Sequence, residues 1–500
     1  MTIRNHLLSA LSALALAACA AGPDYVPPAV TPTASGPFLS TESSAVTAQP
    51  VAADWWRLYD DPVLDRLIED ALAANTDIRV AAARVARARA MLRGARADRE
   101  PQAQINADAN YGRQPAIQRF AGLDREDWII DAGLDVAYEV DLFGRVSRGV
   151  EAAEGDVGAA QADARAVRVA IVAETARAYA DAASSAARLK VANDIVGLLD
   201  RSLSLTRRRH QAGFDTGLDT ARIAALRNQR AADVPAIEAQ RDAALFRLAE
   251  LTGRVPADLP AIAAERADML ILDQPIPVGD GAALLARRPD VRAAEQRLAA
   301  ATARIGVVTA DLYPRISLGG SVGSTSTSFG DMFGAGPFRW LLGPLIGWTF
   351  PNQSKARARI AAAEADTQGA LAEFDGTVLA ALREVETALS VYQHDLQRRS
   401  DLQAAYEEAK RAVEITRAQQ RVGSVDSLAL LDAERTFADA NAALANADAA
   451  LSGDQIDLFR TLAGGWGPPE SDVLTGRRSS TATDDGDERD WSQNLADLSD

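Results

Sequence analysis

Histidine and cysteine, two residue types that often carry catalytic or metal-binding chemistry, are rare in this 500-residue sequence and scattered along it. The three histidines are His6, His210 and His394, and the single cysteine is Cys19. Histidines this far apart along the chain predict neither a metal centre nor a catalytic triad. The sequence also lacks a phosphate-binding loop, a G-x-G-x-x-G run, an H-E-x-x-H run and a cysteine pair. We therefore predict no enzyme activity, no cofactor and no metal site.

The chemistry open to Cys19 is acylation. The cysteine follows Arg4 and an apolar stretch of about eleven residues, Leu7–Ala17, which is typical of an export signal and too short to span a membrane. Leu16–Cys19 resembles a bacterial lipobox, in which the cysteine becomes the first mature residue and carries acyl chains, palmitate among them. A lone free thiol would also be a liability in an oxidising compartment. We predict a lipoprotein signal peptide at 1–18; the alternative is ordinary cleavage without a lipid.

The residue after the cysteine bears on the destination of the protein. An aspartate at that position would indicate retention in the inner membrane, whereas here it is Ala20, as in lipoproteins sent to the outer membrane. Residues 19–50 are rich in proline, serine, threonine and alanine, and we predict a lipidated, extended tether. Residues 467–500 show no apolar period, and we predict a disordered acidic tail.

The bulk composition favours long helices over a large globular core. The hydrophobic share is 48%, but much of it is alanine, and aromatic residues are only 5%. Alanine buries little area, so helices that approach closely through small side chains are favoured. The formal net charge of -16 makes nucleic acid an improbable partner.

The sequence contains an internal duplication. Asp77–Arg79 matches Asp290–Arg292, and Leu245–Arg247 matches Leu458–Arg460, both pairs 213 positions apart. We place the first repeat at 51–254, a linker or equatorial segment at 255–280 and the second repeat at 281–466. Each repeat opens with a heptad of alternating small and large apolar residues, which favours close helix packing: Ile78, Ala81, Val85, Ala88, Leu92 and Ala95, then Val291, Ala294, Leu298, Ala301, Ile305 and Val308.

Two strands are predicted next in each repeat, at about 102–111 and 128–141, then at about 315–326 and 338–350. From 130 to 141 the even positions are apolar and most of the odd ones acidic, a period of two. In the last strand Trp340, Trp348 and Phe350 suit the two aromatic girdles of a membrane barrel. A long proline-free helix follows each pair of strands and ends at Gly213 or Gly423, where a tight turn leads to a returning helix.

A strand of about ten residues with one apolar and one polar face is what a transmembrane β-barrel requires. A globular sheet covered by helices is the alternative, but little apolar surface remains to build a covering layer. Four strands cannot close a barrel, because about eight are the minimum, and open edges are excluded from lipid. The chain must therefore form oligomers: two copies supply eight strands and three supply twelve. These arguments leave the choice between dimer and trimer open.

Over roughly residues 17–466 the sequence resembles the TolC-like outer-membrane factors, and within them the lipoproteins that serve resistance-nodulation-division efflux pumps. The order of its motifs carries the resemblance, together with the duplication: Gly22–Tyr25, Asp54–Trp56, Asp61–Leu64, Tyr138–Arg145, Arg288–Val291, Ala294–Glu295, Glu384–Glu386, Val422–Gly423 and Leu430–Arg435. It implies a homotrimer, mainly α-helical, in which a 12-strand transmembrane β-barrel continues as a 12-helix periplasmic α-barrel. It also implies outer-membrane lipid, a periplasmic adaptor (membrane fusion) protein and an inner-membrane transporter as partners.

The resemblance further implies a channel gate near the tip turn, at Leu428, Asp432 and Arg435. Their spacing puts all three on one helix face, about two turns past Gly423. Around a threefold axis Asp432 would form a ring of three carboxylates, which attracts cations and resists closure unless arginines counter it. An inconsequential surface ion pair is the alternative. The matching position in the first repeat is Arg222, so the ring would come from the second repeat alone.

These observations predict an outer-membrane channel for the efflux of drugs and other toxic small molecules, conferring multidrug resistance. One alternative keeps the channel but assigns protein secretion as its task. Another is a trimeric coiled-coil adhesin or spacer, which would not need strands with one polar and one apolar face. A soluble helical scaffold is a further alternative. The sequence does not identify the cargo, because selectivity would lie in the pump partner.

Overall fold

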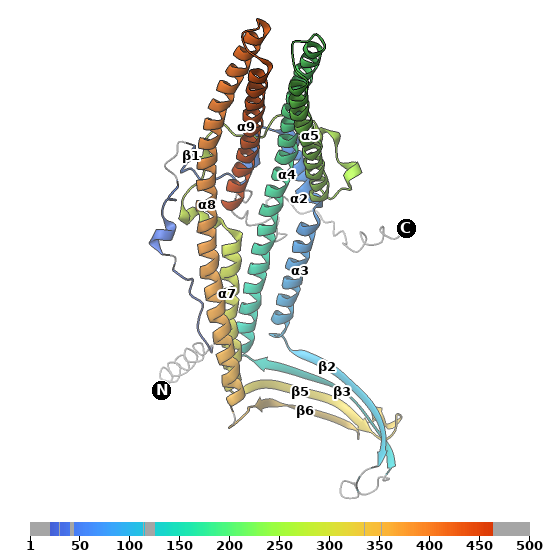
Figure 1. Ribbon diagram of the computed structural model, residues 1–500. Helices are drawn as coiled ribbons and strands as arrows, with labels where there is room; N and C mark the ends of the chain where they lie inside the picture. Colours follow the sequence, from blue (N-terminus) through green and yellow to red (C-terminus); the bar gives the residue numbers. More distant parts are fainter. Residues whose placement is uncertain are drawn as a thin grey trace, which may run out of the picture. The chain divides into compact units, whose positions relative to one another are not determined.

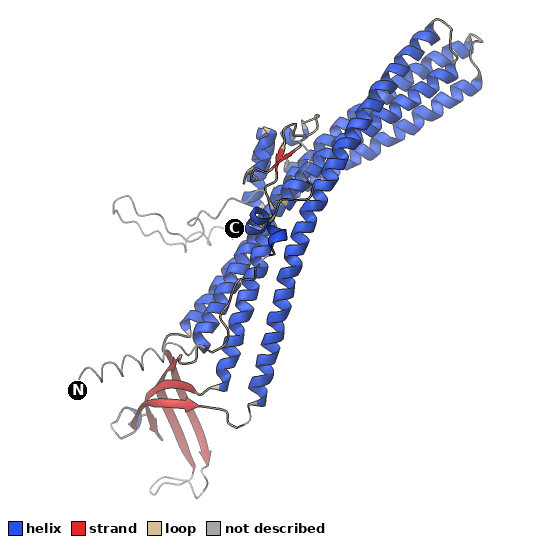
Figure 2. Cartoon of the chain, turned by 90° about the vertical axis from the view of Figure 1, so that its left-hand side faces the viewer, coloured by secondary structure: helices blue, strands red, loops and turns tan. Residues whose placement is uncertain are grey.

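The computed structural model describes residues 21–29, 31–40, 45–113, 115, 126–334, 336–351 and 353–463. The predicted signal peptide, Cys19 and the predicted tail at 467–500 lie outside these residues. The described chain is mainly helical, with a four-stranded sheet at one end of four neighbouring helices (Figure 1). A view from the side shows the long strands gathered at one end of the helices and a short strand pair beside their middle (Figure 2). Among the described residues, no helix combines the length and apolar character needed to cross a membrane.

The duplication is visible in the helices. The first repeat supplies α3 (Thr76–Ala97), α4 (Arg145–Gln211) and α5 (Gly217–Leu251), and the second supplies α7 (Pro289–Thr309), α8 (Ser354–Arg421) and α9 (Ser427–Thr461). The two long helices, α4 and α8, contain 67 and 68 residues because no proline interrupts them. At 1.5 Å per residue each spans about 100 Å. The tip of each long helix leads into a returning helix, as predicted.

The two tip turns are built alike. Gly213 and Gly423 take left-handed backbone angles, with φ of +81° and +75°, which glycine adopts without steric cost. One residue later, the amide of Phe214 donates to the carbonyl of Arg209, and that of Ser424 to Gln419, as in a Schellman motif. Capping then starts each returning helix: the Thr216 hydroxyl and the Asp426 carboxylate accept backbone amide hydrogens.

The four long strands form one antiparallel sheet in the order β2-β3-β5-β6. Their bounds, β2 Gln102–Arg113, β3 Glu126–Val140, β5 Arg315–Ser326 and β6 Phe338–Gly347, lie close to the predicted ones. The prediction that the last strand reaches 350 was wrong. Its partner strand β5 begins at Arg315, which pairs with Gly347, so the ladder ends there. Trp348 and Phe350 stack beyond the strand, with ring centres 4.9 Å apart.

The register separates the sheet into two unlike faces. Leu134 pairs with Val322, and Val322 with Trp340, so these three side chains share one face. Asp135 and its partner Ser321 lie on the opposite face. The first face is apolar across all four strands and is exposed in the single chain, with large side chains at Ile105, Tyr111, Trp128, Leu134, Val136, Tyr138, Leu318, Val322, Phe338, Trp340, Leu342 and Ile346.

The main hydrophobic core lies beside the middle of α4. There Trp55 is fully buried and stacks on Phe459, with ring centres 4.6 Å apart. Helix α2 (Pro62–Ala74) and α6 (Gly281–Arg287) lie in this region, as does a short parallel pair formed by β1 (Val46–Thr47) and β4 (Ile276–Pro277). The predicted tether is therefore not free throughout, because Phe38 and β1 pack on the body of the protein.

Candidate functional site

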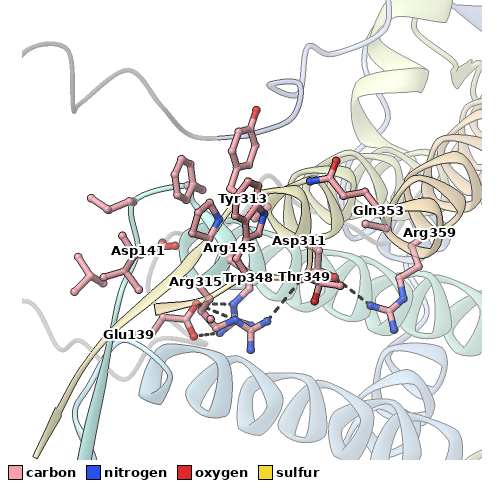
Figure 3. Close-up of a pocket in the computed structure, with 18 of the residues that line it drawn as sticks. Glu139, Asp141, Arg145, Asp311, Tyr313, Arg315, Trp348, Thr349, Gln353 and Arg359 are labelled. Carbon is pink, nitrogen blue, oxygen red and sulfur yellow. Dashed lines mark hydrogen bonds and ion pairs between the residues drawn. The ribbon is translucent and has the colours of Figure 1, made fainter. Parts of the chain in front are cut away.

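A pocket of about 470 Å³ lies where the sheet meets the helices (Figure 3). Its walls come from the end of β3, the start of α4, the turn before β5 and the start of α8. The Arg145 guanidinium donates two hydrogen bonds to the Glu139 carboxylate, at 2.7 and 2.5 Å. Asp311 pairs with Arg359 at 3.1 Å and with Arg315 at 3.6 Å. Arg315 of the second repeat also lies 4.0 Å from Glu139 of the first, so the ion pairs join both repeats at this junction.

Helix-capping contacts at the start of α4 set the direction of the chain at the junction. Asp141 accepts hydrogen bonds from the backbone amides of Val146 and Ser147, at 3.0 and 2.7 Å, and so begins α4 immediately after β3. A carboxylate at a helix N-terminus also opposes the positive end of the helix dipole. Gly144 has φ of +78°, which lets the chain turn from strand to helix. These contacts fix how the chain passes from β3 into α4.

At the other end of the helices, the predicted gate residues Leu428, Asp432 and Arg435 lie on α9 and all three are exposed. Arg435 does not pair with Asp432 within the chain; its Nε lies 3.9 Å from the carboxylate of Asp439. In the described part of the chain, the Asp432 carboxylate has no hydrogen-bond or ion-pair partner. The group is therefore free to pair with a partner outside the described chain.

The opposite face of α9 carries a residue to which the sequence analysis assigned no role. Glu434 is fully buried, accepts a hydrogen bond from the Ser202 hydroxyl at 2.6 Å and lies 3.3 Å from the guanidinium of Arg417. Burial raises the pKa of Glu434, against the opposing effects of Ser202 and Arg417. A signal existed in the sequence: Leu430, Glu434 and Ala438 are four residues apart, so an acid interrupts an apolar stripe.

Glu434 is one of several links between the two helical hairpins near the tip. Ser202 lies on α4 and Arg417 on α8, so this carboxylate joins three helices. The Ser427 hydroxyl donates to Asp215 at 2.9 Å, and Arg230 pairs with Asp439. Both contacts connect the first repeat to the second. The tip is therefore held together by polar links beside a small apolar cluster of Ile195, Leu199, Leu226 and Ala438.

A second carboxylate cluster lies farther along α9. Burial, followed by the neighbouring Asp395 carboxyl of α8, raises the pKa of Asp454 to about 7. Arg177 of α4 opposes this rise, and Asp457 of α9 adds to it. The carboxyl of Asp454, which faces that of Asp395, therefore holds a proton up to about pH 7.

We expect this cluster to make the folded protein less stable as pH rises. Between the ordinary aspartate pKa near 4 and about 7, the folded state holds a proton on Asp454 that the unfolded chain has released. Raising the pH through about 7 therefore favours unfolding, and the thermal midpoint should fall by a few degrees from pH 5 to 8. Asp454→Asn should reduce that fall, measured by thermal unfolding in detergent. Glu414→Gln, at an exposed position on α8, is the matched control; an equal slope in all three proteins would refute the assignment.

The described residues contain no cluster of three or more histidine, cysteine, aspartate or glutamate side chains arranged to hold a metal ion. Among the described residues, the ion pairs of the junction and the polar links of the tip lie at opposite ends of the same long helices, and the Asp395–Asp454 cluster lies between them.

The chain resembles known proteins in both sequence and structure. A family model described as outer membrane efflux protein matches residues 67–254 and 282–464. The chain is 32% identical to outer membrane protein OprJ of Pseudomonas aeruginosa, over 93% of this chain and 96% of that protein. It is also 32% identical to the solvent efflux pump outer membrane protein SrpC of Pseudomonas putida, over 91% and 97%. The solved structure of the outer-membrane channel OprN matches with a TM-score of 0.84 and 36% identity, over 90% of this chain and all of that one.

Proposed function

Because this chain belongs to the outer membrane efflux protein family, we propose that three copies assemble into the outer-membrane channel of a tripartite efflux pump. The four strands of each copy would join into a 12-strand barrel, and α3, α4, α7 and α8 would continue it as a 12-helix periplasmic tube. Small toxic molecules would pass through the tube without chemical change. Their export would be driven by an inner-membrane resistance-nodulation-division transporter, coupled through a periplasmic adaptor protein.

Unequal burial of the repeated helices supports a ring. Helix α7 packs against both α4 and α8 and buries ten residues, whereas α3, its counterpart, packs on α4 and buries only Ala81. One flank of α3 and one flank of α8 are therefore uncovered. Placing α3 of one copy against α8 of the next repeats the contact that α7 makes with α4. Such head-to-tail contacts close into a ring when the rotation allows it.

The sheet supports the same assembly. Strands β2 and β6 are its outer strands, and in the described chain each pairs on one side only. Pairing β2 of one copy with β6 of the next would remove every open edge, as lipid requires. The apolar face would then point outward to lipid, and the face with Asp131 and Asp135 would line the lumen. Aromatic residues lie towards both ends of the strands, with Tyr111 and Trp128 at one end and Tyr138 near the other.

Membrane attachment would have two parts in this proposal. The barrel spans the outer membrane, and acyl chains on Cys19 add a lipid anchor at its periplasmic side. Several relatives are named for the efflux of solvents, toluene or antibiotics, which favours small molecules as cargo. Secretion of proteins is the second candidate, and the N-terminal lipobox with Asp54–Trp56 favours efflux over it.

The proposal is tested by current through planar bilayers that contain the mature protein. We expect discrete conductance steps from a particle whose native mass is three times that of one chain. The steps should be small or infrequent if the tip is closed at rest, as we propose. A trimer without current in any condition would favour the spacer, and a monomer would contradict the ring. The helix and barrel numbers would be revised if the mass corresponded to two copies.

A further inference from the structure

The first described residues, from Ala21 onward, pack against the protein instead of extending into solvent. They contact the helices α4 and α7. The backbone amide of Ala21 donates a hydrogen bond to the carbonyl of Phe143, at 3.0 Å. Phe143 belongs to the short turn between β3 and α4, and its ring stacks on that of Tyr313, with ring centres 4.5 Å apart. The N-terminal chain therefore meets the body at the junction between sheet and helices.

Two glycines make this contact possible. Gly22 has φ of +88°, and a Cβ atom at this position would lie 2.5 Å from the Cα of Gly306 on α7. A Cβ atom at Gly306 would in turn lie 2.7 Å from the carbonyl oxygen of Ala21 and 2.7 Å from the Arg148 side chain. Two backbones approach each other here with no room for any side chain. This close approach depends on glycine, because any other residue at position 306 would displace the N-terminal chain.

An ion pair holds the next residues. The Arg148 side chain on α4 is 9% exposed and pairs with Asp24 and, at 2.8 Å, with Glu151. A guanidinium this buried needs its carboxylates, because an unpaired buried charge is costly. The Asp24 side chain is 87% exposed. Its carboxylate therefore pairs with the buried guanidinium while it stays largely hydrated.

We propose that Gly22, Asp24, Phe143, Arg148 and Gly306 form an anchor seat, which docks the lipidated N-terminus at a fixed place on the channel wall. The proposal rests on lipidation of Cys19. That cysteine lies two residues before Ala21, so the length of the chain between them keeps its Cα atom within about 8 Å of that of Ala21. The seat is close to the end of the apolar face, since Val140 ends β3 and Phe143 follows three residues later. The acyl chains thereby enter the membrane at the level of the barrel rim instead of at the end of a long tether.

The seat can be tested with a photoreactive phenylalanine analogue in place of Tyr25 and a specific protease site inserted between Ser40 and Ala45. Cells are labelled with radioactive palmitate, the full-length protein is irradiated and cut, and the fragments are separated under denaturing conditions. If the N-terminus is seated, cross-linking keeps the label on the large fragment. In Gly306→Leu, retention should fall by roughly an order of magnitude, because the crossing has no room for a side chain.

Gly94→Leu is the matched control, since Gly94 is also in a helix but a Cβ atom there meets nothing within 4 Å. Asp24→Arg is the second variant: it reverses the charge facing Arg148 on an exposed segment and leaves the helices intact. It too should lower retention several-fold. Equal retention in wild type, Gly306→Leu and Asp24→Arg would overturn the seat. Absence of palmitate from all proteins would instead refute lipidation, and the mass of the cross-linked fragment would still report whether the segment is seated.

Discussion

Asp432→Ala should raise the time-averaged current through the channel by roughly tenfold, which corresponds to about 1.4 kcal/mol. Asp432 has no partner in the described part of its own chain, and Arg435 lies nearest Asp439. In a trimer, the partner of each carboxylate would then come from the neighbouring subunit. Three exposed ion pairs of up to about 1 kcal/mol each are enough to keep the tip closed most of the time. The measurement is single-channel recording of the mature trimer at fixed salt.

Two variants make this test specific. Arg222→Ala changes the exposed residue at the matching position of the first repeat and should leave the current unchanged. Exchanging the charges in Asp432→Arg with Arg435→Asp should restore the small current if the two groups meet across subunits. Equal currents from wild type and Asp432→Ala would keep the channel but place its gate elsewhere, with the Glu434 contacts the next position to examine.

Leu342→Arg should prevent insertion of the barrel, whereas Leu341→Arg should be tolerated. The two leucines are neighbours on β6 and both are exposed in the single chain, at 76% and 64%. Leu342 shares the apolar face with Trp340 and Ile346, near the middle of the strand, while Leu341 pairs with Ser321 on the polar face. An arginine at the bilayer midplane costs about 2–4 kcal/mol per chain, and three chains carry it in each trimer.

The measurement is the fraction of each variant recovered as oligomer in outer membranes, with urea unfolding in lipid vesicles as a second readout. Leu341→Arg places its charge in a water-filled lumen, close to the existing pair of Arg339 and Asp131, which lie 2.7 Å apart. A sheet that stayed in water would treat the two substitutions alike. Equal recovery of both variants would therefore contradict a membrane barrel in this orientation.

Much of the fold follows from local patterns in the sequence. The alternation of apolar and acidic residues across 130–141 predicts β3, because successive side chains of a strand point to opposite faces. The long helices follow from the absence of proline, and the tip turns follow from Gly213 and Gly423. The efflux function was predicted from the resemblance, and it is confirmed by the family match and the relatives.

Other features depend on contacts between distant segments and could not be predicted from one sequence. The end of β6 is set by the start of its partner strand at Arg315, not by its own residues. The seat of the N-terminus depends on Gly22 meeting Gly306, which lie 284 positions apart. Glu434 is an ordinary helix residue until Ser202 and Arg417 are brought beside it. A composition-based description of residues 19–50 as a tether misses both β1 and the contact at Ala21.

The lengths of α4 and α8, 67 and 68 residues, have a mechanical consequence. Beyond the main hydrophobic core, whose last residues on the two helices are Ala180 and Tyr392, each helix extends about 45 Å to the tip. Bending this part by about 6° would displace the tip by about 5 Å, which is enough to change a constriction of atomic size. Links placed at the tip, such as those of Asp215 and Glu434, oppose a given torque with the smallest force. A protein that pulls on the tip would act on these links and on the small apolar cluster beside them, while the core at the middle of the helices stays in place.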